Sequence, residues 1–214
     1  MFAKRLFDIV FSLIGLIVFS PLLLAIAIWI KLDSKGPVFY RGKRTGLHGK
    51  PFLIYKFRSM VSDAEKKGGP STSDSDSRIT RAGRFVRKFK LDELSQFINV
   101  LLGDMSFVGP RPEVQQYTDQ YTEEEKAILS VRPGITDWAT IWNSDEGAVL
   151  AKYDDPDKAY EEVIRPTKLK LQLYYVHNRS LWMDFKLVVY TILRVINRRF
   201  YPKELSAYPK LLDD

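Results

Sequence analysis

The sequence predicts a mainly helical α+β protein in two parts, residues 1–36 and residues 37–214. Three observations predict this class. An uncharged apolar run with a break lies near the N-terminus, two short apolar-aromatic runs follow around a turn, and later segments carry apolar residues at helical spacing. The 214 residues suffice for one core plus a membrane appendage, but not for a two-domain dinucleotide enzyme.

The composition limits the chemistry that the chain can perform. A formal net charge of +7 favours polyanionic partners such as nucleic acid, anionic lipid or a phosphorylated substrate. The absence of cysteine excludes disulfides, thiolate nucleophiles and Cys-ligated zinc. Two scattered histidines, His48 and His177, disfavour a histidine triad or metal cluster. Carboxylates and basic groups must therefore carry any chemistry.

Residues 9–30 are uncharged and about as long as a bilayer-crossing helix. The run is too long for the apolar core of a signal peptide and lacks a cleavage motif. Pro21 interrupts it, so we expect a bend at Ser20-Pro21. Positive residues on both flanks fit two cytoplasmic ends, as in a re-entrant helix-break-helix hairpin. A kinked spanning helix is the equal alternative from the residues alone.

Residues 37–44 and 51–58 predict a small β-hairpin. Alternation along the second strand places Lys56 and Arg58 on one face, where two cations can hold a phosphate. A solvated edge strand explains the pattern equally well.

Residues 62–77 read as a polar loop rich in Ser, Gly and Asp. Within the loop, Asp74-Ser75-Asp76 resembles the metal-binding D-x-D of nucleotide-sugar glycosyltransferases. Chance occurrence in a solvated linker is the preferred interpretation. Residues 154–157 are expected to form a turn leading into a helix.

A basic stripe follows this loop, with an arginine at every third position. A helix here would present it to lipid headgroups or to a polyphosphate. Nucleic acid is the disfavoured partner, because no nucleic-acid-binding module or interleaved exposed aromatics follow. The stripe consists of Arg78, Arg81, Arg84 and Arg87.

A helix ended by Gly103 is predicted next, with Asp92 and Glu93 near its start and off its buried stripe. Asp92 there could simply be an N-cap. Alternatively, the positive end of the helix keeps a carboxylate ionised, and such a carboxylate can attack phosphorus or hold magnesium. The predicted stripe comprises Leu91, Leu94, Ile98 and Leu101.

Arg111 lies between two prolines in Gly109-Pro110-Arg111-Pro112. The prolines stiffen the backbone that presents the guanidinium. A fork held in this way suits bidentate phosphate binding. A turn with a solvated arginine is the alternative.

The C-terminal residues 181–200 combine a large apolar face with several basic residues. This composition predicts an amphipathic helix at a membrane interface. A second spanning helix and a buried core helix are the alternatives.

Together these segments resemble the small monotopic phosphoglycosyl transferases, bacterial sugar transferases that begin polysaccharide and glycoprotein assembly. The resemblance covers nearly the whole chain. It implies a re-entrant hairpin broken at Ser20-Pro21 and a catalytic domain over residues 37–214, at the cytoplasmic face of a bacterial inner membrane. Its carriers are Ser20-Pro21 and residues 55–60, 79–113 and 132–136.

The resemblance also implies transfer of a sugar phosphate from a UDP-sugar donor to polyprenol (undecaprenyl) phosphate, with release of UMP. Asp92 would be the nucleophile and a magnesium ligand, with Glu93 its partner in the dyad. The reaction would pass through a covalent aspartyl-phosphosugar intermediate with Mg²⁺ bound. The phosphate-binding candidates are Arg111, Lys56, Arg58 and Arg87.

The sequence departs from the common family pattern at Asp137-Trp138, where Gly-Trp is usual. The segment over residues 139–165 is longer and more acidic than in the most compact members of that family, so we assign no donor-specificity residue there. A hydrolase of lipid-linked or nucleotide diphosphates and a non-catalytic membrane scaffold are the alternative functions. The sequence leaves dimerisation open.

Overall fold

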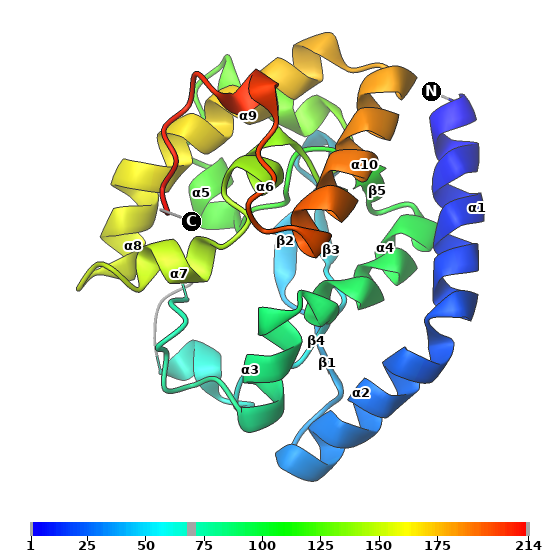
Figure 1. Ribbon diagram of the computed structural model, residues 1–214, viewed down its shortest axis with the longest axis vertical. Coiled ribbons are helices and arrows are strands. Elements are labelled where there is room, and N and C mark those ends of the chain that lie inside the picture. Colours follow the sequence, from blue (N-terminus) through cyan, green and yellow to red (C-terminus); the bar gives the residue numbers. More distant parts are fainter. Residues whose placement is uncertain (1, 68–71, 213–214) are drawn as a thin grey trace.

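The computed structural model describes residues 2–67 and 72–212 (Figure 1). Helices predominate in this part of the chain, and its strands form three separate two-stranded ladders. The predicted α+β, mainly helical class is confirmed.

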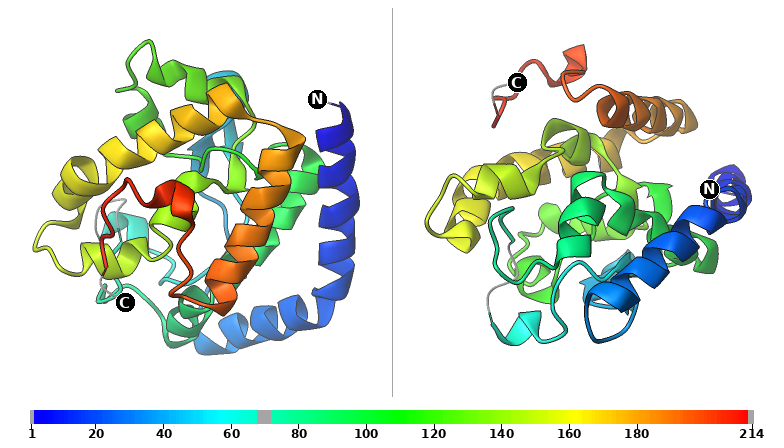
Figure 2. Two further views of the ribbon diagram at one scale, coloured as in Figure 1. Left: turned by 45° about the horizontal axis from the view of Figure 1, so that its top comes forward. Right: turned by 60° about the horizontal axis from the view of Figure 1, so that its bottom comes forward.

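Two helices meet at a sharp bend at the N-terminus. α1 (Phe2–Val18) and α2 (Ser20–Asp33) are inclined by 63°, and Figure 2 shows them as an L-shaped pair along one side of the molecule. Pro21 lies in the first turn of α2, and Ser20 Oγ donates to the Ile17 carbonyl at 2.8 Å. The predicted bend at Ser20-Pro21 is confirmed. None of the described helices alone is long and apolar enough to cross a bilayer, whereas the bent pair meets that test in length and composition.

Charged side chains fasten α1 to the rest of the fold. Lys4 Nζ lies 2.6 Å from Asp184 Oδ2. Arg5 donates to two carbonyls near the end of α4 (Phe97–Leu102), at 2.6 and 2.8 Å. The buried Asp8 carboxylate accepts hydrogen bonds from the Ser106 hydroxyl and the next backbone N–H. The position of α1 is therefore set by specific polar contacts.

The predicted hairpin is present but interrupted, because its strands pair in two short antiparallel ladders. The turn that joins the two arms of the hairpin is a 3-10 helix, η1 (Leu47–Gly49), with left-handed backbone at His48 and Gly49. The outer ladder pairs β1 (Phe39–Tyr40) with β4 (Lys56–Phe57), and the inner one pairs β2 (Lys43–Thr45) with β3 (Pro51–Leu53).

Two helical segments replace the single helix expected before Gly103. The 3-10 helix η3 (Leu91–Gln96) leads into α4, which ends at Gly103 in left-handed conformation. The expected buried leucine and isoleucine stripe is only half buried, and the prediction that Asp92 lies off the buried face is wrong. The buried face instead carries Asp92, Ser95, Gln96, Asn99 and Val100.

The main hydrophobic core joins α6 (Trp138–Trp142), α9 (Arg165–Asn178) and α10 (Leu181–Ile196). Beside it, β5 (Ser106–Val108) and β6 (Gly134–Thr136) form a parallel pair. The C-terminal segment (red in Figure 1) passes over α6, and Trp142 Nε1 donates to the Pro209 carbonyl at 2.9 Å. The remaining elements are η2 (Ala64–Lys66), α3 (Arg81–Lys88), α5 (Gln115–Thr118), η4 (Glu125–Ser130), α7 (Glu146–Leu150), α8 (Pro156–Ala159), η5 (Tyr160–Ile164) and η6 (Lys203–Leu205).

α10 is amphipathic, as the sequence predicts, and in it only Asp184 and Leu187 are buried. The alternative of a buried core helix is therefore wrong. Large apolar side chains on its other faces are exposed: Leu181, Trp182, Phe185, Ile192, Leu193, Val195 and Ile196. The expected turn before α8 is confirmed, since Asp155 caps that helix through the N–H groups of Asp157 and Lys158.

Candidate active site

Four predicted site residues meet at one place. Lys56 Nζ lies 3.0 Å from Glu93 Oε1 and 3.7 Å from Asp92 Oδ2. Arg111 contacts Glu93 with both ends of its guanidinium, and one of these bonds joins Nη1 to Oε2 at 3.1 Å. The sequence places these residues up to 55 positions apart (111 − 56), and the fold brings two carboxylates and two cations together.

Buried polar residues on η3 and α4 explain why Lys56 faces the dyad. Asn99 accepts from the backbone N–H of Tyr55 at 2.7 Å and donates to the Leu53 carbonyl at 2.9 Å. Ser95 donates to the Tyr55 carbonyl at 3.1 Å. These bonds satisfy backbone groups of Leu53 and Tyr55 that no neighbouring strand pairs, and they hold β4 directly against η3. The polar spacing from Asp92 through Ser95 to Asn99 is the sequence signal for this buried face.

Asp92 is not the N-cap residue of its helix, which was the alternative role suggested by its position. Lys90 occupies the N-cap of η3 in left-handed conformation, with φ of 56°. Asp92 lies inside the 3-10 helix and is buried, with 6% of its surface exposed. A carboxylate at this depth requires compensating charge, which Lys56 supplies.

Arg111 is held at its backbone as well as at its side chain. Its N–H donates to Asp137 Oδ2 at 3.2 Å, and Gln172 Nε2 donates to the same oxygen at 3.2 Å. Asp137 is fully buried, and its other oxygen caps α6 through the Thr140 N–H at 2.7 Å. Sequence reasoning marked Asp137 as a departure but gave it no role.

The backbone just before Arg111 is held by close contact with the backbone at Gly134. The N–H of Gly134 donates to the Pro110 carbonyl at 2.9 Å, where the chain leaves β5 beside β6. A Cβ atom at Gly134 would collide with the backbone of Gly109. Glycine is therefore required for the two segments to pack at this distance.

The charges of the site reinforce one another. Burial acts to raise the pKa of Glu93, but Arg111 and Lys56 outweigh it and hold that pKa well below its usual range. Burial likewise acts to lower the pKa of Arg111, and the Glu93 carboxylate raises it instead. Glu93 and Arg111 therefore form an ion pair beside Asp92, and a guanidinium at this place can bind a phosphate group next to Asp92.

A second buried ion pair lies behind Arg111. Glu113 Oε1 lies 2.8 Å from Lys168 Nζ and accepts from the Tyr160 hydroxyl at 2.7 Å. Burial acts to raise the pKa of Glu113, while Lys168 and Tyr160 lower it. The Glu113 carbonyl accepts from the Thr45 N–H at 2.9 Å, which links this pair to the hairpin. No pattern in the sequence indicated this ion pair.

Residues 1–198 match the family of bacterial sugar transferases. The chain belongs to this family. The resemblance predicted from the sequence motifs is thereby confirmed.

Curated relatives of this sugar transferase extend over most of its length. The UDP-N-acetylgalactosamine-undecaprenyl-phosphate N-acetylgalactosaminephosphotransferase of Aeromonas hydrophila is 41% identical over 91% of this chain and 44% of its own. The UDP-glucose:undecaprenyl-phosphate glucose-1-phosphate transferase of Escherichia coli K12 is 38% identical over 92% of this chain and 41% of its own. The chain thus spans less than half the length of these two relatives.

A relative of comparable size is the uncharacterized sugar transferase EpsL of Bacillus subtilis. It is 37% identical over 92% of this chain and 88% of its own length.

The guanidinium of Arg58, a predicted phosphate ligand, is hydrogen-bonded within this sugar transferase, away from the dyad. Its side chain is buried, and its guanidinium donates to the Ser34 carbonyl at 2.8 Å, to the Lys35 carbonyl and to Ser62 Oγ at 3.0 Å. Carbonyls past the end of a helix are unpaired and attract a cation. Arg58 therefore joins the end of α2 to the hairpin.

Arg87 lies in the last turn of α3 and is half buried. Its charge helps to lower the pKa of Asp76, behind the larger effect of Arg78 and against burial. The predicted contact of Arg87 with a substrate phosphate stays a prediction.

The basic stripe is divided by the fold. Arg78 precedes α3 and forms a salt bridge with Asp76 at 2.6 Å, whereas Arg81 and Arg84 are exposed on the helix. Asp76 thus takes part in an ion pair, and Asp74 packs against Gly147. Across residues 2–67 and 72–212, no group of three or more His, Cys, Asp or Glu side chains could hold a metal by itself.

Proposed function

We propose that this sugar transferase moves a sugar 1-phosphate from a UDP-sugar to polyprenol phosphate and releases UMP. The observation that carries the proposal is the dyad itself: a buried Asp92 beside a Glu93 that two cations hold. The names of the Aeromonas and Escherichia relatives, which both specify undecaprenyl phosphate and a UDP-sugar, support it.

The proposal gives the two carboxylates different roles, supported by their different contacts. Both oxygens of Glu93 are engaged by Arg111, and one of them also by Lys56. Asp92 has the longer contact, 3.7 Å from Lys56. Asp92 is therefore the nucleophile, and Glu93 orients the cations around it.

The reaction proceeds in two displacements at the same phosphorus. An Asp92 oxygen attacks the sugar-bearing β-phosphorus, and the bond from that phosphorus to the bridging oxygen breaks, so UMP leaves with the bond's electrons. A polyprenyl phosphate oxygen then attacks the aspartyl-bound phosphorus. The acyl-phosphate bond breaks, Asp92 returns as a carboxylate, and the lipid-linked diphosphosugar is complete.

The cations of the site bind the charges that move in these steps. Lys56 and Arg111 lie on the dyad and can donate to oxygens of the diphosphate. Prearranged donors of this kind stabilise charge that develops in the transition state. Arg111 is especially suited because its backbone is fixed by Asp137.

Magnesium is part of the proposal, with Asp92 as its protein ligand. A site with one carboxylate fits Mg²⁺, which commonly takes its other ligands from substrate phosphates and water. The ion would neutralise the diphosphate.

The site is proposed to lie at the cytoplasmic face of the bacterial inner membrane. The bent α1–α2 pair would enter one leaflet as a re-entrant hairpin, and α10 would lie on the surface with its exposed apolar side chains in lipid. Lys4 and Asp184 join the two membrane elements at 2.6 Å. The apolar side chains that the bent pair and α10 both leave exposed support a monotopic arrangement.

The proposal is tested by incubating the full chain with polyprenol phosphate, Mg²⁺ and a panel of UDP-sugars. We expect UMP and lipid-linked diphosphosugar to form together over repeated turnovers, and without the lipid no more than one UMP per protein molecule, from the first displacement. Repeated phosphate-bond cleavage without lipid acceptor would identify a hydrolase instead. A chain whose Asp92→Asn variant retains its biological function would be a scaffold.

A further inference from the structure

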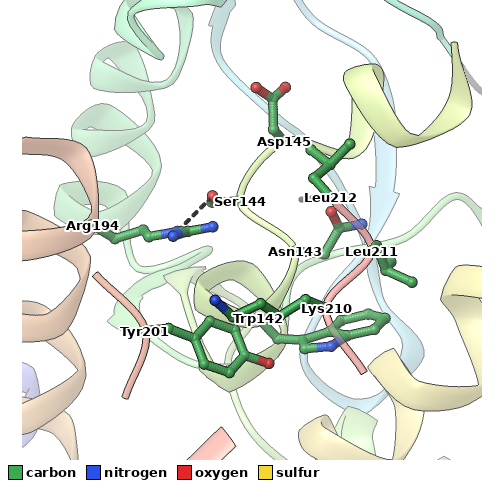
Figure 3. Close-up of a pocket in the computed structure, with 9 residues that line it drawn as sticks. All are labelled: Trp142, Asn143, Ser144, Asp145, Arg194, Tyr201, Lys210, Leu211 and Leu212. Atoms are coloured by element: carbon green, nitrogen blue, oxygen red, sulfur yellow. Dashed lines mark hydrogen bonds between the residues drawn. The ribbon is translucent and has the colours of Figure 1, made fainter. Parts of the chain in front are cut away.

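The cavity between the α6–α7 loop, α10 and the C-terminal tail is too small for a substrate (Figure 3). It has room for about one or two water molecules, and Arg194 and Ser144, on two of its walls, are joined by a hydrogen bond of 3.0 Å. The acceptor in the proposed function is a long apolar chain with a phosphate at one end. Such a molecule needs an exposed apolar surface that leads to the dyad.

Three exposed aromatic side chains form a row from α2 to the end of α3. The ring of Trp29 in α2 lies 5.2 Å from the ring of Phe85 in α3, measured between centroids. The ring of Phe85 lies 4.8 Å from that of Phe89. The exposed fractions of the three residues are 37%, 44% and 49%, so none of them belongs to the core. We call these three residues the aromatic row.

The aromatic row connects the bent α1–α2 pair to the catalytic site. Buried residues of α2 and α3, among them Ile30 and Val86, pack together, so the two helices lie side by side (Figure 1). On α2 the apolar surface continues to Leu32, which lies one turn after Trp29 and is exposed. At the other end of the row, Phe89 precedes the nucleophile of the dyad by three residues (92 − 89). An apolar chain on this row would therefore extend from α2 toward the dyad.

Two exposed lysines flank the last ring of the aromatic row. Lys88 Nζ lies 5.7 Å from the centroid of the Phe89 ring, and Lys90 directly follows Phe89 in the chain. Within residues 2–67 and 72–212, neither ammonium group forms a hydrogen bond or an ion pair. Both cations are therefore available to an anion at this end of the row.

The backbone of Lys90 places this residue next to the dyad. Its φ is 56°, which is uncommon for a residue other than glycine. Its N–H donates to the Arg87 carbonyl at 3.0 Å, and its own carbonyl accepts from the Glu93 N–H at 3.3 Å. The charge of Lys90 also helps to lower the pKa of Glu93, against burial and after the larger effects of Arg111 and Lys56. A phosphate bound to Lys90 would therefore lie near the dyad, as the second displacement requires.

We propose that the aromatic row receives the polyprenyl chain of the acceptor and that Lys90 binds its phosphate. The proposal rests on the proposed function. An apolar row that ends at two cations is complementary to a molecule with an apolar chain and an anionic head. Polyprenol phosphate would meet the row at α2 and bring its phosphate to the dyad at Lys90. Lys56 and Arg111 are then left to the diphosphate of the donor.

The test replaces Lys90 by glycine, which removes the charge and adopts the left-handed backbone without strain. Full-length protein in nanodiscs of neutral phosphatidylcholine is assayed for lipid-linked product. For Lys90→Gly we expect kcat/KM for polyprenol phosphate to fall about 3- to 10-fold, as for one lost contact, and Lys90→Arg should restore it. Because the donor reacts in the first displacement, kcat/KM for the UDP-sugar and the UMP released without lipid should stay as in the wild type. Lys203→Ala, at an exposed lysine on η6, is the matched control.

Phe89→Ala tests the aromatic row, with Tyr153→Ala as its control at a similarly exposed aromatic residue. We expect Phe89→Ala to lower kcat/KM for polyprenol phosphate by about 3- to 10-fold, because apolar contact with the chain is lost, and to leave kcat/KM for the UDP-sugar unchanged. The control should change neither value.

Acceptor kcat/KM values that match those of the controls in both Lys90→Gly and Phe89→Ala would overturn the proposal while leaving the transferase function standing. An equal fall in kcat/KM for both substrates would also overturn it, because the two residues would then serve the fold or the donor. A loss for Lys90→Gly that is confined to nanodiscs containing anionic phosphatidylglycerol would overturn it in favour of membrane headgroups. Absence of lipid-linked product from the wild type with every UDP-sugar would instead overturn the proposed function.

Discussion

Arg111 meets Glu93 through both ends of its guanidinium, while its own backbone N–H is held by Asp137 at 3.2 Å. The arginine is thus fixed at two points before any substrate arrives. Because both oxygens of Glu93 are engaged by Arg111, the proposed function assigns the covalent chemistry to Asp92. This division of roles leads to the predictions that follow.

Replacing Asp92 by asparagine should remove turnover without unfolding the protein. The amide keeps the shape of the side chain but cannot form the acyl phosphate, so we expect activity to fall by about 1,000-fold or more. UMP release measures the loss, and a thermal melt checks folding. Mass spectrometry of wild-type protein quenched with donor alone should find the sugar phosphate on Asp92, and its discovery on another residue would disprove the assignment.

Arg111→Lys should be far from conservative. Lysine keeps the charge but cannot reproduce a two-point contact with Glu93, so we expect kcat/KM to fall by about 10- to 100-fold. The matched control is Arg84→Lys, an exposed arginine on α3. Equal effects of the two substitutions on steady-state UMP release would show that the two-point contact is unimportant.

Asp137→Asn should weaken catalysis through Arg111. Asparagine in place of the buried carboxylate loses the charge that holds the Arg111 N–H and caps α6, at a cost of about 1–3 kcal/mol in the free energy of unfolding. If Asp137 acts through Arg111, the activity loss of Asp137→Asn combined with Arg111→Lys will be smaller than the product of the single losses. Multiplying losses would mean that Asp137 serves stability alone.

Acid should destabilise the fold through Glu113. Burial acts to raise the pKa of Glu113, but the ion pair with Lys168 outweighs burial, and the net pKa is lowered. The contribution of Glu113 to the free energy of unfolding is therefore complete above the unfolded-state pKa of about 4.3. It is lost as pH falls through the lower folded-state pKa. Chemical unfolding in detergent should show this loss in the wild type. Glu113→Gln should be less stable at neutral pH, by about 3–5 kcal/mol, and should lack this part of the acid dependence.

The N-terminus should be accessible from the cytoplasm. Positive residues flank the bent pair on both sides, and Pro21 begins α2 immediately after the bend. A tag placed before Met1 should therefore react with an impermeant reagent only after the inner membrane is opened. Labelling of intact spheroplasts from the periplasmic side would instead indicate a spanning helix.

Local features of the fold were predictable because they depend on neighbouring residues. Pro21 bends the N-terminal helix wherever it lies, Gly103 ends α4 through its left-handed backbone, and Asp155 caps α8. The dyad and Arg111 were also identified from the sequence, by motif. Their meeting with Lys56 was expected only from the family resemblance.

Contacts over long sequence distances were not predictable from local patterns. Alternation placed Arg58 beside Lys56, but the carbonyls past the end of α2 bind its guanidinium. Helical spacing placed leucines on the inner face, but the backbone edge near Tyr55 required the polar partners Ser95 and Asn99. Unpaired backbone groups decided both cases, and a sequence does not show which ones the fold leaves unpaired.

The sequence by itself determined the broken apolar helix, the family and the carboxylates and cations available for phosphate chemistry. Only the tertiary structure decided which carboxylate is engaged by Arg111, which arginine closes a helix end and where Asp137 acts. The reason is physical: the residue type fixes the charge and shape of a side chain. Its partner is fixed by burial, which joins groups far apart in the chain wherever an unpaired charge or backbone group would otherwise remain.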